Sequence, residues 1–531
     1  MSNPCQYDGF SFLPTELFEA LLSYLDVDSI KTLRLTSGKI AKRCLGPRFL
    51  ACIQQPVLDV SSENLRSLIA LGRNPDIRKK VNSLTFLATI MDISGLEKNI
   101  EDGYYIVEKF NGPGFRRVEV DYSPKELSDA KDDLIWLKKQ KEAKENESPS
   151  ELVGLLGHAL KAFGELNAIH LDGAVIRGRK ERRSLKHGEW VSLWTRAAQV
   201  FSWVITALPQ SQASVKRLDL YQSNRQCGLE AATINSLNLT HDLAELEVPL
   251  KGLQSLEMSI SGDVQDALDY RKRREEEDEE EDTSREENDQ ASPRKKARKS
   301  KEEDYHGIPS LPSFFLKSAP SLRKLEFSFR HTGPPGSKLF EHKYDWIMDS
   351  IAHEAQFSML EECAFAGLPA RSDSILLFLQ KSLSIRSLTI HECHLSSGSW
   401  TPIFAHLEKS MPELQSLDLS NLWGKHMQNM KYVQAHVRDS NDNIREEAED
   451  DWQEGDGMVI LRPIWDSNPI PRRTRYMSTK GIVVHTRSFT REEIKKGLIF
   501  RPLNNGPGRP KASPEHWSWR RKRIVLYGPL E

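Results

Sequence analysis

The sequence predicts an α/β fold in which a short N-terminal module of three helices is followed by a long array of repeated helix–strand units. Three observations predict it. Leucines recur at helical spacing within residues 10–52, the pattern apolar-x-x-apolar-x-apolar recurs between Val81 and Leu419, and a charged run at 271–304 interrupts that pattern. With 531 residues, the chain is long enough to bury a large core.

The composition excludes some classes of protein. A formal net charge of −2 gives no overall field that would attract nucleic acid or an anionic membrane. The six cysteines are scattered without a CxxC pair, which indicates reduced thiols in an intracellular protein. The start MSNPCQYDGF lacks the features of a secretion signal, and the apolar stretch FSWVITAL is too short to span a bilayer. We therefore expect a soluble protein of the nucleus, the cytoplasm or both, with no membrane partner.

The first predicted helix begins near Pro14. Proline suits the first turn of a helix, because the N–H that it lacks would have no partner there, and Glu16 suits the positive end of the helix dipole. Apolar residues then follow at one-face spacing: Leu17, Phe18, Leu21, Leu22 and Leu25.

Two further short helices are expected before residue 46. Asp28 or Ser29 can cap the second, and Thr36 or Ser37 can begin the third. Three helices of this size bury little surface between them, so a partner is expected to cover the apolar side chains that they leave exposed.

These residues resemble the F-box. The resemblance lies in Leu13-Pro14-x-Glu16-Leu17, in the leucine-rich helix that ends at Tyr24-Leu25-Asp26, and in Ile30-x-x-Leu33-Arg34-Leu35-Thr36-Ser37. It implies a module at residues 10–52 that binds the adaptor of an SCF-type, cullin-based ubiquitin ligase. The adaptor-binding residues that it implies are Leu13, Pro14, Glu16, Leu17, Leu21, Ile30 and Leu33.

The chain departs from the family after Ser37. The family commonly has a Cys and a Trp there, and this chain has Gly38, Lys39 and Ile40. A glycine inside the third helix would cost about 1 kcal/mol relative to alanine, so we expect a frayed helix or a modest affinity for the adaptor. The alternative to an F-box is an ordinary amphipathic helix that caps the following domain.

Short strands are predicted wherever the apolar pattern recurs. Four of the segments share a stricter pattern and read VKRLDL, LQSLEM, LRKLEF and LQSLDL. Several follow an apolar helical segment and a turn, as in SFFLKSAPSLRKLEF, where the turn contains a proline. The segments begin at Val81, Phe115, Leu166, Val215, Ile234, Leu253, Leu322, Ile385 and Leu414.

A helix, a turn and a short strand that repeat every 20–50 residues can bury their leucines only by stacking on neighbouring units. The array resembles an irregular leucine-rich-repeat-like solenoid, of the degenerate kind that follows F-boxes in many fungal proteins. Its intervals are uneven, with 25 residues from Leu360 to Ile385 and 49 from Leu166 to Val215. We expect it to occupy residues 75–265 and 307–424. A plain α/β sandwich is the alternative.

Residues 266–306 are predicted to be a disordered insertion in the array. Eleven acidic residues lie among the fifteen from Glu275 to Asp289, and such a composition cannot bury enough apolar surface to fold. The basic block that follows resembles part of a nuclear-import signal, and the alternative is a solvated charge run. The candidate import residues are Arg294, Lys295, Lys296, Arg298 and Lys299.

The C-terminal part is expected to comprise a polar linker at 425–457 and a β-rich cap or tail at 458–531. GMVILRPIW and GIVVHTRSF have the β-branched content of strands. HWSWRRKRIVLY places Trp517 and Trp519 beside the basic residues 520–523. Aromatic and basic residues together indicate nucleic-acid stacking, or else a terminal strand that covers the last repeat.

The sequence holds no recognisable catalytic motif, and we expect neither an enzyme nor a cofactor. HExxH, GxSxG, GxxxxGK[ST] and a GxGxxG after a strand do not occur. The one cluster of ligand-type residues runs from His391 to His394 and directly follows a predicted strand. Because residues of a strand alternate between its faces, we interpret it as a loop cluster and not as a metal site.

The prediction for function is a substrate-recognition subunit of an SCF-type ubiquitin ligase. The F-box would bind the adaptor and through it the cullin, and the repeat array would bind an unknown target protein. The alternative is a nuclear scaffold or nucleic-acid-binding protein that uses the basic blocks 293–299 and 520–523, and a nucleic-acid partner is expected only in that case.

Overall fold

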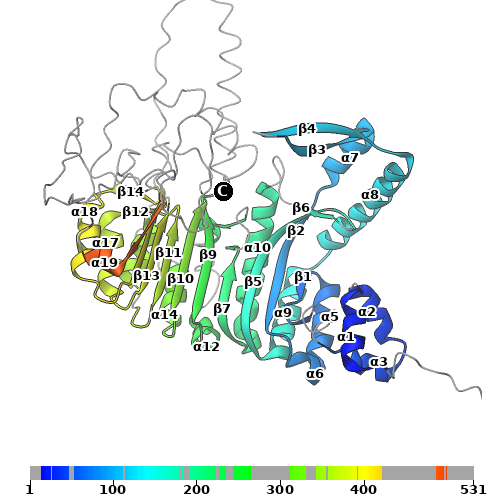
Figure 1. The fold of residues 1–531 in the computed structure, drawn as a ribbon, viewed down its shortest axis with the longest axis horizontal. Helices are drawn as coiled ribbons and strands as arrows, with labels where there is room; N and C mark the ends of the chain where they lie inside the picture. Colours follow the sequence, from blue (N-terminus) through cyan, green and yellow to red (C-terminus); the bar gives the residue numbers. More distant parts are fainter. Residues whose placement is uncertain are drawn as a thin grey trace, which may run out of the picture.

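The fold is that of a computed structural model, which describes residues 13–25, 27–46, 53–111, 114–179, 181–183, 190–222, 227–234, 243–264, 311–330, 343–354, 357–391, 393–420, 422, 486–495 and 498. In these residues the protein is a mixed α/β structure built around a large, mostly parallel sheet. Figure 1 shows the strands side by side in chain order, with three N-terminal helices at one end of the row.

The three N-terminal helices form a small module with its own core. They are α1 (Thr15–Ser23), α2 (Val27–Arg34) and α3 (Gly38–Arg43). The core of the module consists of Phe18, Leu22, Ile30, Ile40 and Cys44. Ile53 packs against this core and also against the core of the sheet, so it connects the two.

The helix starts differ in part from those expected. The Ser37 hydroxyl accepts a hydrogen bond of 3.2 Å from the Ile40 N–H and caps α3, as predicted. The second helix begins at Val27, before the two residues that were expected to cap it. Gly38 is the first residue of α3 and not an interior one. The expected helix-interior cost of glycine is therefore wrong for this position, and fraying on that account is not expected.

The main sheet follows the order of the chain. Every neighbouring pair of strands along it is parallel, except the last pair, which is antiparallel. Its strands are β1 (Val57–Asp59), β2 (Ser83–Met91), β5 (Glu165–Gly178), β7 (Ser214–Leu220), β9 (Ser255–Ser261), β10 (Lys324–Arg330), β11 (Glu362–Ala366), β13 (Ser387–His391), β15 (Ser416–Ser420) and β16 (Thr486–Thr490). Two short strands add to its sides, β6 (Glu181–Arg183) on β5 and β8 (Leu229–Glu230) on β9.

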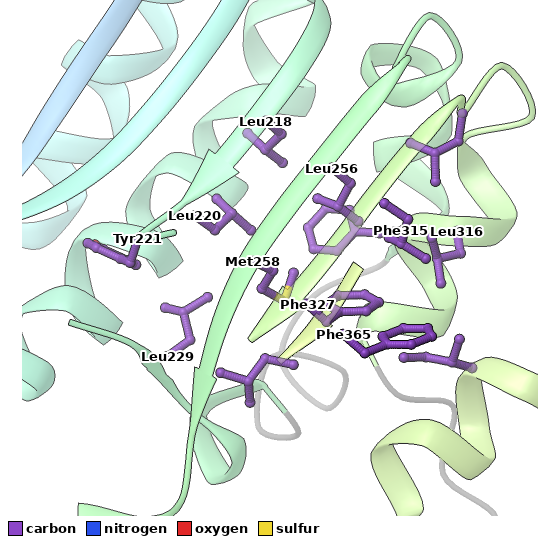
Figure 2. Packing of buried hydrophobic residues seen from close by; sticks show 14 of the residues in the cluster. Leu218, Leu220, Tyr221, Leu229, Leu256, Met258, Phe315, Leu316, Phe327 and Phe365 are labelled. Atoms are coloured by element: carbon purple, nitrogen blue, oxygen red, sulfur yellow. The ribbon is translucent and has the colours of Figure 1, made fainter. Parts of the chain in front are cut away.

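Helices cover one face of this sheet and form the core with it. They are α5 (Ser62–Arg73), α6 (Pro75–Arg78), α9 (Pro149–Phe163), α10 (Trp190–Ser211), η2 (Leu243–Leu246), α12 (Glu247–Leu250), α14 (Leu311–Ser318), α16 (Asp345–Glu354), α17 (Ser372–Lys381), α18 (Thr401–Lys409) and α19 (Arg491–Lys495). Alternate strand residues point toward them, among them Leu218, Leu256, Met258 and Phe327 (Figure 2). One continuous cluster of buried side chains extends from Val60 to Leu498.

Most predicted strands lie in the sheet. The segments that begin at Val81, Leu166, Val215, Leu253, Leu322, Ile385 and Leu414 contain or overlap β2, β5, β7, β9, β10, β13 and β15. The segment at Phe115 is a strand, as predicted, but it does not lie in the main sheet. It belongs to β4 (Gly114–Asp121), which forms a separate antiparallel hairpin with β3 (Tyr104–Asn111). The spacing of apolar residues marks a strand but does not show which strand it pairs with. Of the segment at Ile234, the structure describes only the first residue.

The predicted order of helix, turn and strand is present in four units: α10 with β7, α14 with β10, α17 with β13, and α18 with β15. In the first of them Pro209 lies inside the last turn of α10, and not in the turn after the helix where it was expected. Two shorter strands, β12 (Pro369–Arg371) and β14 (His394–Ser397), follow β11 and β13 and pair in parallel with each other.

A long excursion separates β2 from β5. It consists of α7 (Ile93–Asp102), the β3–β4 hairpin and α8 (Pro124–Glu145), and Figure 1 shows it projecting beside the ends of those strands. A capping box of Ser123 and Glu126 begins α8. At the other end of α8, Lys144 forms an ion pair with Asp59 of β1 at 2.6 Å and donates a hydrogen bond to Thr89 of β2. The excursion is thereby fixed to the first two strands of the sheet.

The strands on either side of the charged insertion are direct neighbours. Ser255 of β9 lies opposite Lys324 of β10, and the register continues to the ends of both strands. The insertion itself, with the candidate import residues 294–299, lies outside the described residues, as do the basic residues 520–523. Of the C-terminal tail, β16 and α19 are described, and Phe489, Ile494 and Leu498 of this segment are buried in the main core.

None of the helices in the described ranges combines the length and the apolar composition needed to cross a bilayer.

Candidate functional site

An apolar stripe on α1 is the most exposed apolar feature of the N-terminal module. Pro14, Leu17, Leu21 and Tyr24 follow one another at intervals of three or four residues, so they lie on one side of the helix. Leu17 is 58% exposed and Tyr24 is 88% exposed. We call these four residues the α1 stripe. Phe18 and Leu22, one position further along, are buried in the module core, so α1 is apolar on a face that its own module does not cover.

The other predicted adaptor-binding residues divide into two groups. Glu16 is exposed beside the stripe, and Leu13 and Leu33 are half-buried against the module core. Ile30 is fully buried at 0% exposure, so it could only support the adaptor-facing surface from inside the module. Sequence reasoning gave no role to Leu35, which directly follows α2 and is 87% exposed.

On β7, β9 and β10 the face of the sheet opposite the helices is polar. Because the strands are parallel and in register, Asp219, Glu257 and Glu326 lie side by side on β7, β9 and β10. In the row before them are Arg217 and Lys324. We call these five residues the polar ladder. Along each strand these residues alternate with buried apolar residues of the core, because successive side chains of a strand point to opposite faces of the sheet.

Ion pairs connect the polar ladder across three strands. Glu257 is buried and contacts Arg217 at 2.9 Å and Lys324 at 2.8 Å. Lys324 also contacts Glu326 at 3.5 Å, and the Gln222 amide donates a 2.7 Å hydrogen bond to Glu326. Burial alone lowers the pKa of Lys324, but the hydrogen bond and charge of Glu257 outweigh it and raise that pKa. The ladder thus neutralises most of its own charge.

The neighbouring part of the same face carries small side chains. Ala364, Thr389, Asp418 and Ser488 form one row across β11, β13, β15 and β16. His391 on β13 lies 3.7 Å from the Asp418 carboxylate. This part of the face is also polar.

Two carboxylates lie close together where β8 and β9 end. The Val264 N–H donates a 3.0 Å hydrogen bond to Glu230, and Lys343 pairs with Asp263 at 2.9 Å. Burial, assisted by the charge of Asp263, raises the pKa of Glu230 although the Val264 N–H opposes the shift.

Replacing Glu230 by glutamine is expected to stabilise the fold at neutral pH and not at acid pH. The folded pKa of Glu230 lies above its ordinary value of 4.5. Protonated Glu230 therefore contributes to the stability of the fold below pH 4.5, and this contribution is lost as the pH rises through the folded pKa. Glutamine is neutral throughout. The midpoint difference between Glu230→Gln and wild type in thermal denaturation should therefore widen from about pH 4 to pH 7. A constant difference, or one equal to that of the exposed control Glu247→Gln, would contradict this account.

The side chains of His391 and Cys393 do not converge on one site. His391 faces Asp418 on the polar face, while the Cys393 thiol is buried and contacts the Phe365 carbonyl at 3.7 Å. In the part of the chain that the structure describes, no three His, Cys, Asp or Glu side chains are grouped so that they would hold a metal ion. Burial raises the pKa of the Cys44, Cys227 and Cys363 thiols, which keeps them protonated at neutral pH.

A shallow groove of about 420 Å³ lies between α9 and α10 on the outer side of the helix layer. The side chains that line it carry no ionisable group, so it offers neither an acid nor a base for catalysis. They are Pro149, Ser150, Val153, Gly154, Ser202, Thr206 and Gln210.

Comparison of the chain with protein-family models and with curated proteins finds no match. The assignment of a function therefore depends on the α1 stripe and the polar face.

Proposed function

We propose that the protein is the substrate-recognition subunit of an SCF-type cullin ubiquitin ligase. In this proposal the N-terminal module is an F-box that binds the ligase adaptor through the α1 stripe. The polar face of the sheet binds the target protein. The chain itself performs no chemistry and acts by holding target lysines near a ubiquitin-charged enzyme, which raises their effective concentration.

The observation that carries the proposal is the exposure of the α1 stripe. A helix on a protein surface normally exposes polar residues on the side away from its core. Here Leu17 and Tyr24 are exposed beside a module core that, among the described residues, has five fully buried members. A partner that covers the stripe would stabilise a module this small, and exposed apolar patches of this kind are typical of interaction sites.

The backbone between the units supports a leucine-rich-repeat-like solenoid. The same hydrogen bond recurs before successive strands, from the N–H of one unit to the carbonyl of the preceding one. It joins Gln254 to Lys216 at 2.7 Å, Arg323 to Gln254 at 2.8 Å, and Glu361 to Arg323 at 2.8 Å. Arg386 and Gln415 continue the series. In a solenoid each unit contacts mainly its neighbours, and repetition of one connection is what such stacking requires.

The Leu17→Asp variant is expected to lose adaptor binding, because a carboxylate in a desolvated apolar contact costs several kcal/mol, about a thousandfold in affinity. The measurement is co-purification of the full chain with the adaptor and cullin, detected by mass spectrometry in 0.5 M salt. The matched control is Ile135→Asp, which places the same charge at an apolar residue of α8 that is 68% exposed.

Retention of the adaptor by Leu17→Asp would count against the proposal, as would equal loss in the Ile135→Asp control. Salt separates the proposal from the nucleic-acid alternative. Binding dominated by phosphate contacts weakens steeply as ionic strength rises, whereas a docked apolar helix changes little. Capture of nucleic acid at low salt alone, with no adaptor at any salt, would favour the alternative.

A further inference from the structure

The first turn of α1 lacks the usual helix cap. Pro14 is the capping residue, and it makes no side-chain hydrogen bond to the turn that follows. Helices α3, α5 and α8 each have a serine in this position that accepts a hydrogen bond from the first turn. The start of α1 is also the start of the α1 stripe. Without that bond, contacts from other parts of the module bear directly on the position of Pro14 and Leu17.

Arg43, the last residue of α3, contacts this start from across the module. Its guanidinium donates hydrogen bonds to the carbonyls of Leu13 and Pro14, the second at 3.4 Å. The same guanidinium lies 4.3 Å from the centre of the Phe18 ring. The Pro14 carbonyl also accepts the Phe18 N–H at 3.0 Å, which is the first hydrogen bond inside α1. One side chain thus joins the residue before α1, its capping residue and its first core residue to α3.

The chemistry of arginine suits this task. The guanidinium is planar, remains charged and presents several N–H groups in a fixed fork, so it can contact two carbonyls and an aromatic face together. Lysine offers a single ammonium on a flexible stem and can reproduce the contacts only in part. Lys42, the preceding residue, is exposed and has no such contact with α1 among those described.

We propose that Arg43 is a positioning residue for the adaptor-binding surface. It takes the place of the missing cap and fixes the orientation of Leu13, Pro14 and Leu17 relative to the module core. It acts through these residues and does not itself belong to the α1 stripe. This inference rests on the proposed function, because the surface that Arg43 would hold in position is the one that the adaptor would cover.

The test compares the full-length protein with Arg43→Met, Arg43→Lys and Lys42→Met. Methionine keeps an aliphatic side chain against Phe18 and removes the charge and the donors. Two quantities are measured, the affinity for purified SCF adaptor and the hydrogen exchange of peptides that contain Thr15–Ser23. For Arg43→Met we expect about tenfold weaker binding and about tenfold faster exchange in the first turn of α1, as for loss of one charge-assisted hydrogen bond. Arg43→Lys should restore part of both, and Lys42→Met should match wild type.

Each outcome has a separate meaning. Wild-type affinity or wild-type exchange in Arg43→Met would overturn the positioning role. Equal losses in Arg43→Met and Lys42→Met would also overturn it, because both remove the same charge from the end of α3. If Arg43→Met unfolds the module, Arg43→Lys decides, since a positioning role requires it to lie between wild type and Arg43→Met. If wild type does not bind the adaptor, the proposed function fails, and the inference fails with it whatever the exchange shows.

Discussion

Replacing Phe327 by alanine is expected to lower the free energy of unfolding of the sheet by about 3–5 kcal/mol, the range for large-to-small changes at aromatic core positions. Phe327 is fully buried in β10, where it lies beside Met258 of β9 and Phe365 of β11. Figure 2 shows it among side chains of three strands and α14. Because Phe327 is fully buried among packed side chains, its truncation should leave a cavity.

The measurement is denaturant unfolding of the full chain, with Phe327→Leu as the conservative variant and Val248→Ala as the control. Val248 is 72% exposed, and a surface truncation of this kind changes stability by less than about 0.5 kcal/mol. If Phe327→Ala loses no more than this control, the packing of α14 and the strands about Phe327 is not what the structure shows.

The second large effect is expected at the ion pair of Asp59 and Lys144. Asp59→Ala should destabilise the protein by about 3–5 kcal/mol, because it leaves a buried ammonium without its counter-charge. The Lys144 and Asp59 side chains are only 13% and 19% exposed, and their atoms approach to 2.6 Å. Burial lowers the pKa of Lys144 even though the charge of Asp59 opposes the shift. Without Asp59 the ammonium would have to lose its proton or pull α8 off the sheet.

Two further variants test this prediction. The double variant Asp59→Leu with Lys144→Met should lose less than Asp59→Ala alone, since replacement of both charges by apolar groups is often neutral. Glu151→Ala, which breaks an exposed pair with Arg66, should cost less than about 1 kcal/mol. Thermal denaturation and hydrogen exchange of α8 report both effects. A double variant that is less stable than Asp59→Ala would refute the account.

Most strands of the sheet were predictable because each carries its own signal, although β1 was not among the predicted segments. In VKRLDL and LRKLEF the apolar positions alternate with charged ones, and the alternation is what places Leu218 and Leu325 in the core and Asp219 and Glu326 on the opposite face. The helices that precede these strands were predictable for the same reason, because each is marked by apolar residues within its own segment. The excursion from α7 to α8 could not be distinguished from the array by its sequence. The apolar residues of β4 have the same spacing as those of a sheet strand, and only the pairing of β4 with β3 distinguishes the two.

The candidate site was predictable in part. Leu17, one of the residues predicted to bind the adaptor, is exposed. The spacing of the leucines in α1 shows that the helix has more apolar surface than its own core can cover. Ile30, another of these residues, is buried, and the spacing of apolar residues in one short helix did not show that it points inward. The polar ladder needed the register between β7, β9 and β10, and strands separated by long stretches of chain do not disclose their register.

The antiparallel strand at the end of the sheet has a consequence for synthesis on the ribosome. β15 ends at Ser420 and β16 ends at Thr490, 70 residues later. At about 5–20 residues per second, those residues take about 4–14 s to make. During that time the outer edge of β15 has no strand from its own chain to pair with, and an unpaired edge is where chains join one another. The last unit is therefore a part of the nascent protein that a chaperone would protect, and any mutation that delays the pairing of β16 prolongs its exposure.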